Sequence, residues 1–175
     1  MTPWRDNPRL KGKFHPDFPD DIEVIVHDGG PHMTNHRPEN IWVRVTGCQE
    51  KVYTGTVLNQ PYQLDRVRLG STIKFLAPEG GEHPVMVTDK YLSERDDWTI
   101  YPCTSCGLTE LFDAPSDLIR VLFPPKPENR VLVSFTSKCG ACADGVQVVE
   151  TKNFPDEEES SLPDRPAKKW WQFWK

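Results

Sequence analysis

Hydrophobic and polar residues alternate in several short stretches of this chain. The stretches are rich in β-branched residues and are separated by turn-forming residues; they cover residues 22–26, 41–47, 51–58, 71–77, 84–88, 130–136 and 145–150. Successive side chains of a strand point to opposite faces, so the alternation gathers the apolar residues on one face. The pattern predicts a mainly β fold, a small antiparallel sheet or barrel-like domain, with a minor helical part.

Helix is expected in two places. Residues 116–123 predict a short helix with Ser116 as its N-cap and Asp117 in its first turn, where a negative charge interacts favourably with the helix dipole. Residues 88–98 are the second candidate. Helix is otherwise scarce in this sequence.

Composition divides the chain into four parts. Residues 1–20 hold four prolines and little periodicity, which predicts an irregular N-terminal arm that wraps the surface or stays mobile. Residues 21–150 are the β-rich domain. Residues 151–167 are acidic and interrupted by prolines, with too little apolar surface to offset the entropy of ordering, and are predicted to be a disordered linker. Residues 168–175, KKWWQFWK, form a basic aromatic tail.

Four of the five cysteines form two CxxC pairs, Cys103 with Cys106 and Cys139 with Cys142. Two such pairs can hold one zinc ion in a tetrahedral array of thiolates. The pairs are 32 residues apart, against roughly 15 to 20 in the common pattern, but each doubling of a loop costs only about 0.6 kcal/mol. The spacing therefore predicts a zinc-ribbon-like element at 101–150 that binds one structural Zn²⁺.

Glycines accompany both pairs. Gly107 follows the first and Gly140 lies within the second, and glycine permits the positive φ angles and close backbone approach of such turns. Redox-active thiols are an alternative, although neither pair opens a helix after a strand. Catalytic zinc is disfavoured because four thiolates fill its coordination positions. Cys48 is left over, and we interpret it as a small, partly buried apolar residue.

Other chemistry-bearing residues give a weaker signal. His27, His32 and His36 lie close together with Asp28, but their spacing fits no helical face, and we interpret them as solvated loop residues rather than a second metal site. The chain has no serine-hydrolase, zinc-protease, phosphate-loop or dinucleotide motif. No catalytic residue is assigned, and we expect a protein that is not an enzyme.

Charge and hydropathy bear on partners and compartment. The formal net charge of −5 argues against sequence-independent binding of nucleic acid. The first residues lack a basic stretch followed by an apolar run, and no segment approaches the roughly 18 apolar residues that cross a bilayer. We expect a cytoplasmic protein, in which reducing conditions keep the cysteines available to metal.

Residues 41–98 resemble the YegJ-like family of small bacterial proteins. The resemblance rests on IWVRVTG, YTGTVLNQP, RLGSTIKF and DDW, which follow one another in this order, while the insert EGGEHPVMVTDKYLSER departs from the family pattern. The resemblance implies a barrel-like β unit and a bacterial origin, and it transfers no catalytic residue because the family has no assigned activity. Within this part, Trp42, Tyr53 and Phe75 are expected in the core.

The aromatic tail predicts a partner, because exposed indoles need a surface to cover them. The residues expected to bind are Trp170, Trp171, Phe173 and Trp174. Insertion as a helix into a protein groove is favoured over peripheral membrane contact and over docking on the chain itself or on a neighbouring copy. The sequence thus predicts a zinc-stabilised, non-enzymatic binding or adaptor protein. A thiol redox sensor, a nucleic-acid binder through the zinc element, and an immunity or regulatory protein for a bacterial toxin are the alternatives.

Overall fold

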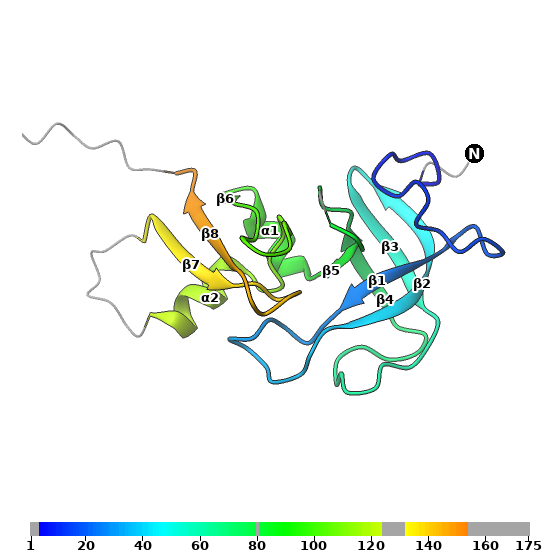
Figure 1. Cartoon of the computed structure of the whole chain (residues 1–175), viewed down its shortest axis with the longest axis horizontal. Helices are drawn as coiled ribbons and strands as arrows, with labels where there is room; N and C mark the ends of the chain where they lie inside the picture. The colour runs from blue at the N-terminus through cyan, green and yellow to red at the C-terminus, as the bar shows by residue number, and fades with distance from the viewer. Residues whose placement is uncertain (1–3, 80, 124–131, 154–175) are drawn as a thin grey trace, which may run out of the picture.

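A computed structural model of the chain describes residues 4–79, 81–123 and 132–153. It has two units side by side: a closed five-stranded barrel, and a three-stranded sheet accompanied by two short helices (Figure 1). The predicted mainly β fold with a barrel and one or two short helices is confirmed.

The barrel is an up-and-down meander closed between its first and last strands. Each strand pairs antiparallel with the next, and β5 pairs parallel with β1. An odd number of alternating strands requires this, because the first and fifth run in the same direction. The strands are β1 Asp21–Val26, β2 Glu39–Gln49, β3 Val52–Val57, β4 Thr72–Leu76 and β5 Val85–Val87.

The alternation that predicted the strands fills the barrel. Ile22, Val24 and Val26 of β1 are fully buried, and the rings of Tyr53 and Phe75 stack inside with centroids 5.3 Å apart. The prediction was wrong for Trp42, which is only half-buried. Its two neighbours in β2 are buried. Because successive side chains of a strand point to opposite faces, the indole of Trp42 points outward.

Outside the barrel, the indole of Trp42 meets His15 of the N-terminal arm, with ring centroids 5.1 Å apart. The described part of the arm follows the barrel surface and seals it. Leu10 is fully buried in the barrel core, and Trp4 Nε1 donates a hydrogen bond to Asp20 Oδ1 at 3.1 Å. Residues with no periodic pattern therefore still contribute to this core.

The second unit is built on an antiparallel sheet in the order β6-β8-β7. Its strands are β6 Trp98–Ile100, β7 Ser134–Lys138 and β8 Val146–Thr151, and its helices are α1 Asp89–Arg95 and α2 Pro115–Leu122. Strand β6 was not predicted, because all three of its residues are half-buried and show no alternation. Phe135 and Val149 of the sheet pack with Leu118 of α2 and Tyr91 of α1 in a separate core.

The helix starts follow different rules. Thr88 caps α1, and its side chain accepts a hydrogen bond from the amide of Tyr91. The predicted cap Ser116 of α2 is wrong: Ala114 occupies the N-cap without a side-chain hydrogen bond, and Pro115 is the first helical residue. Proline favours that position because its missing N–H would be unpaired there and its φ is already helical. Ser116 Oγ instead donates to Glu94 Oε1 at 2.7 Å, which ties α2 to α1.

A third, smaller core joins the two units. Val85 of the barrel packs there with Leu108, Phe112 and two of the cysteines. Neither helix of the described part of the chain has the length and apolar character needed to span a bilayer.

Candidate metal centre

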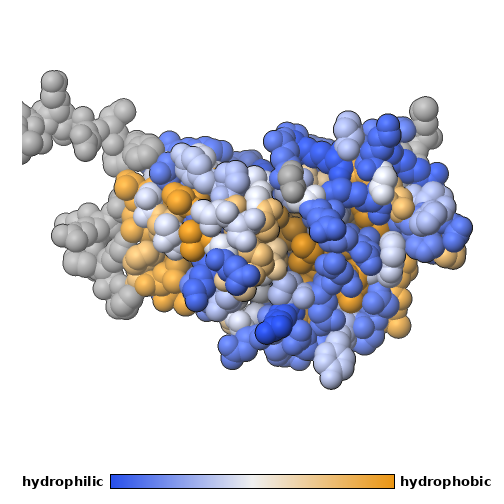
Figure 2. Space-filling view, viewed as in Figure 1, coloured by the Kyte–Doolittle hydropathy of each residue, from blue (hydrophilic) through white to orange (hydrophobic). Residues whose placement is uncertain are grey.

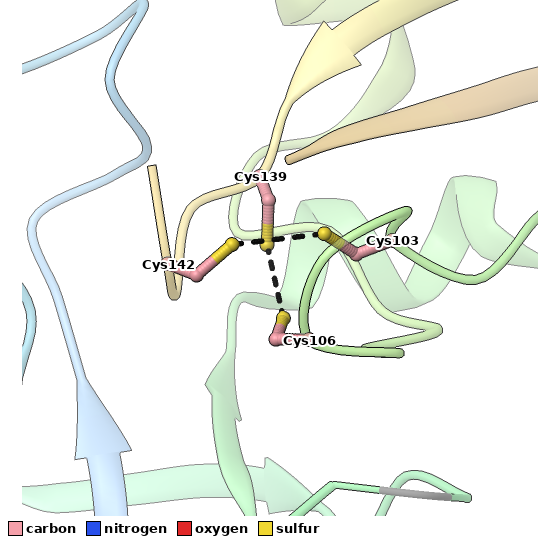
Figure 3. A group of neighbouring side chains, drawn as sticks. All are labelled: Cys103, Cys106, Cys139 and Cys142. Atoms are coloured by element: carbon pink, nitrogen blue, oxygen red, sulfur yellow. Dashed lines mark hydrogen bonds between the residues drawn. The ribbon is translucent and has the colours of Figure 1, made fainter. Parts of the chain in front are cut away.

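Four sulfur atoms converge at one end of the second unit (Figure 3). Cys103 and Cys106 lie in the turn that follows β6, and Cys139 and Cys142 lie in the turn between β7 and β8. All four sulfurs are within 4.8 Å of one another. Two sulfur pairs, 103 with 142 and 106 with 139, are each 3.7 Å apart.

These separations identify the kind of site. A tetrahedron with metal–sulfur bonds of about 2.3 Å has edges of about 3.8 Å, close to the observed 3.7 Å. A disulfide needs sulfurs about 2.05 Å apart, and all five cysteines are free thiols. The four cysteines therefore lie close enough together to hold a metal ion.

The two turns share a backbone design. The amide of Gly107 donates to the carbonyl of Cys103 at 3.0 Å, and the amide of Ala143 donates to that of Cys139 at 3.2 Å. Both donors follow the second cysteine of their pair and have positive φ, 75° for Gly107 and 59° for Ala143. Each turn thus folds back so that its two sulfurs face one point.

The glycines near the pairs have separate roles. Gly107 supplies the left-handed residue of its turn, as expected, whereas in the second turn Ala143 takes this conformation and not a glycine. Gly140 provides close approach instead, because a Cβ there would collide with the ring of Phe112. A Cβ on Gly145 would collide with Cys103 Sγ, so the second turn lies directly against the first.

The sheet brings the two distant pairs together. β8 runs between β6 and β7, with Ile100 opposite Val149 and Lys138 opposite Val146. Beyond β6, the amide of Thr104 donates to the Val146 carbonyl at 3.1 Å. The long insertion between the two cysteine pairs therefore contains α2 and β7. The pairing of β6 and β7 with β8 brings its two ends, and with them the two cysteine pairs, close together.

Backbone amides also shape the electrostatics of the sulfurs. Burial opposes the charged form of Cys142, but the amides of Gly145 and Asp144 donate to its sulfur, and the pKa falls to about 7. Burial raises the pKa of Cys139 well above its ordinary value. Cys139 and Cys103 are buried, whereas Cys106 is exposed. A cation at the centre would compensate the two buried thiolates.

The histidine loop is not the solvated loop that was expected. His27 is only 2 % exposed, and its ring stacks on Phe112 with centroids 4.0 Å apart. Gly29 N donates to its Nδ1 at 3.1 Å, and its Nε2 lies 2.9 Å from Met86 O, so Nε2 carries the hydrogen. Burial lowers the pKa of His27 to about 4 and keeps the ring neutral.

The other two histidines also make contacts. His32 Nε2 accepts a hydrogen bond from the amide of Lys138, which links the loop to β7. His36 Nδ1 lies 3.0 Å from Asp28 Oδ2, and Asp65 is the third member of this group. Both oxygens of Asp28 already accept backbone hydrogen bonds from residues 65 and 66, so Asp28 orders that loop.

Sequence reasoning missed a polar cluster around the buried side chain of Glu110. Tyr91 donates to Glu110 at 2.6 Å, and Arg95 contacts both oxygens of Glu110. Gln147 Nε2 donates to the Glu110 carbonyl at 3.1 Å. Burial and the neighbouring Glu110 raise the pKa of Tyr91, so it stays a donor. No motif marks Glu110, because its partners are distant in sequence.

The predicted partner-binding residues Trp170, Trp171, Phe173 and Trp174 lie outside the described residues. Comparisons with protein families, with curated proteins and with solved structures found no match.

Proposed function

We propose that this chain is a non-enzymatic, bacterial binding or adaptor protein whose second unit is held together by one structural Zn²⁺. The arrangement of the four sulfurs supports the proposal most strongly. Four-thiolate tetrahedral sites are typical of zinc and of iron, and a closed site suits a structural role because it leaves no position for a reacting water. Zinc would give a colourless protein, and iron a coloured one.

The position of the centre supports a scaffolding role. Cys103 and Cys139 pack with Val85 of the barrel and with Phe112, in the core that joins the two units. Metal bound here would fix both turns and, through Phe112, the orientation of the second unit. Metal-binding energy at such a site becomes folding energy.

The proposed binding function rests on the tail and the barrel surface. In one view, hydrophilic residues cover much of the barrel, and hydrophobic ones gather at the far end of the second unit (Figure 2). The aromatic tail, 168–175, is proposed to insert into a groove of a protein partner. The resemblance of 41–98 to the YegJ-like family stays a prediction; β1, which closes the barrel, lies outside that stretch.

The adaptor proposal can be tested with the full chain and a variant that lacks residues 168–175. Each is purified from the same cells, and its bound proteins and its flotation with anionic vesicles are compared. A protein partner lost from the shortened chain, with no vesicle binding by either, is the expected result. Identical partners for both chains would overturn the role of the tail, and vesicle binding by the full chain alone would favour the membrane alternative.

A thiol redox sensor is a second candidate, favoured by the exposure of Cys106. Hydrogen peroxide would take two electrons from two thiolates, forming a disulfide and two hydroxide ions, and metal would be released. Release that dithiothreitol and zinc reverse would support this function. Indifference to mild peroxide would exclude it.

A further inference from the structure

A groove with a basic lining lies between the two units. It encloses about 350 Å³, and its charged lining residues come from the N-terminal arm, the barrel and the second unit: Arg9, Lys51, Arg95, Lys152, Glu79 and Glu110. A neighbouring hollow of about 260 Å³ shares Arg9 and Lys51 with it. We call the two hollows together the basic groove.

The arginines of the basic groove have carboxylate partners. Arg95 forms an ion pair with the carboxylate of Glu110, and Tyr91 donates a hydrogen bond to it. The side chain of Glu110 is only 4 % exposed. Arg9 pairs with Glu79 at the rim. Each of the two carboxylates of the lining is therefore paired with one of the two arginines.

The lysines of the basic groove are not neutralised in this way. Within the described part of the chain, the Lys51 side chain makes no hydrogen bond or ion pair. Lys152 Nζ donates to the main-chain carbonyl of Asp96 at 2.9 Å, which satisfies a hydrogen bond without cancelling the charge. Asp96 Oδ1 also lies 3.7 Å from Arg95 Nη1, so four cationic side chains face three anionic ones, and the remaining positive charge belongs to Lys51 and Lys152. Such an excess attracts carboxylates at low ionic strength.

The chain leaves the described structure beside this groove. Lys152 is part of the lining, and its amide donates to the carbonyl of Asp97 at 2.9 Å, which fixes the exit point. The acidic run DEEE, residues 156–159, begins four residues later. Four extended residues reach about 13 Å and seven about 23 Å, so the run can extend from the exit along the groove.

We propose that the acidic run 156–159 docks in the basic groove of its own chain, with its carboxylates against Lys51 and Lys152. A short tether gives such a segment an effective concentration on the order of millimolar, so weak ion pairs suffice to hold it. The inference does not depend on the identity of the metal.

Zero-length crosslinking of the full chain tests this docking. A carbodiimide joins a lysine amine and a carboxylate only when they are in contact, and peptide mapping then identifies the pair. We expect Lys51 to couple to residues 156–159 several-fold more than the exposed Lys11 and Lys138 do. Coupling of Lys152 is not informative, because it is a near neighbour in sequence.

Controls separate docking from chance encounters. At 1 M salt the screening length falls to about 3 Å, so the Lys51 product should drop to the level of Lys11. A mixture of ¹⁵N-labelled and unlabelled chain should give products of unmixed mass. Equal coupling of all three lysines, no effect of salt, or mixed-mass products would overturn the proposal.

Charge-reversed variants give a second readout. Lys51 is exposed in the turn between β2 and β3, so Lys51→Glu should fold, and Lys11→Glu is its matched control. Glu157→Lys with Glu158→Lys should abolish the coupling of residues 156 and 159 to Lys51, whereas Lys11→Glu should leave it unchanged. Unchanged coupling in the doubly reversed chain would show that charge does not place the run.

Discussion

The imidazole of His27 lies flat on the ring of Phe112, with ring centroids 4.0 Å apart and planes inclined by 8°. His27 follows strand β1 of the barrel, and Phe112 belongs to the segment between the first cysteine pair and α2. The same phenyl ring packs against the backbone of Gly140 in the second cysteine turn. One aromatic contact thus connects the barrel to the metal centre.

The burial of His27 makes stability depend on pH. The folded-state pKa of His27 is about 4, below its ordinary value of 6.5, so acid protonates the unfolded chain first. Stability is fully present above pH 6.5 and falls as the pH drops towards 4, by on the order of 3 kcal/mol in total.

Urea unfolding at pH 7 and pH 4.5 measures this effect. The His27→Gln variant should be less stable at pH 7 but should lose less on acidification than the native chain does. Because metal affinity also falls in acid, the difference between the two chains is the informative quantity. Equal losses would show that His27 does not titrate as described.

The metal ligands should differ sharply from the remaining cysteine. Cys103→Ser removes a ligand from a closed site and is expected to lower the free energy of unfolding by about 4 kcal/mol or more. Cys48 is half-buried beside the barrel, and Cys48→Ser should cost less than about 1 kcal/mol. Thermal unfolding of both variants compares them directly. Similar midpoints would contradict the assignment of the ligands.

Close approach at Gly140 leads to a packing prediction. Gly140→Ala would push a methyl group into Phe112 and should cost about 1–3 kcal/mol, as overpacking does. Gly47 has nothing within 4 Å of an added Cβ, so Gly47→Ala is the matched control and should be nearly neutral. Adding Phe112→Leu should recover part of the Gly140→Ala loss. Additive losses in a double-mutant cycle would refute the contact.

The left-handed alanine of the second turn predicts a stabilising substitution. Ala143 has a φ of 59°, which costs a residue with a Cβ about 1–2 kcal/mol and glycine nothing. Ala143→Gly should therefore raise the free energy of unfolding by about 1 kcal/mol after the extra entropy of the unfolded chain is subtracted. Ala141 has no positive φ, and Ala141→Gly should destabilise. Denaturant unfolding of the two variants should give changes of opposite sign.

Local patterns were enough to predict much of this fold and most of the candidate centre. Alternation indicates strands whose two faces differ, as in β1, where Val24 is buried between the half-buried Glu23 and Ile25. The CxxC pairs predict a metal site because each pair is a local turn. The same local reasoning fails for β6, whose short run lacks two distinct faces.

Contacts between distant residues account for the rest. His27 is buried because Phe112 covers it, and nothing near His27 in the sequence encodes that. Trp42 points outward because its neighbours in the strand point into the barrel. The hydrophobicity of its indole alone wrongly predicts that it is buried. Glu110 is held by Tyr91 and Arg95 of a helix that precedes it, and no motif announces such a cluster.

Metal content tests the central claim most directly. The purified full chain is analysed for metals, and its thiols are then titrated with a mercurial reagent while released metal is followed. We predict about one zinc per chain, released as the four thiols of residues 103, 106, 139 and 142 react. A folded chain that contains no metal, with these cysteines reactive or joined as disulfides, would contradict the account.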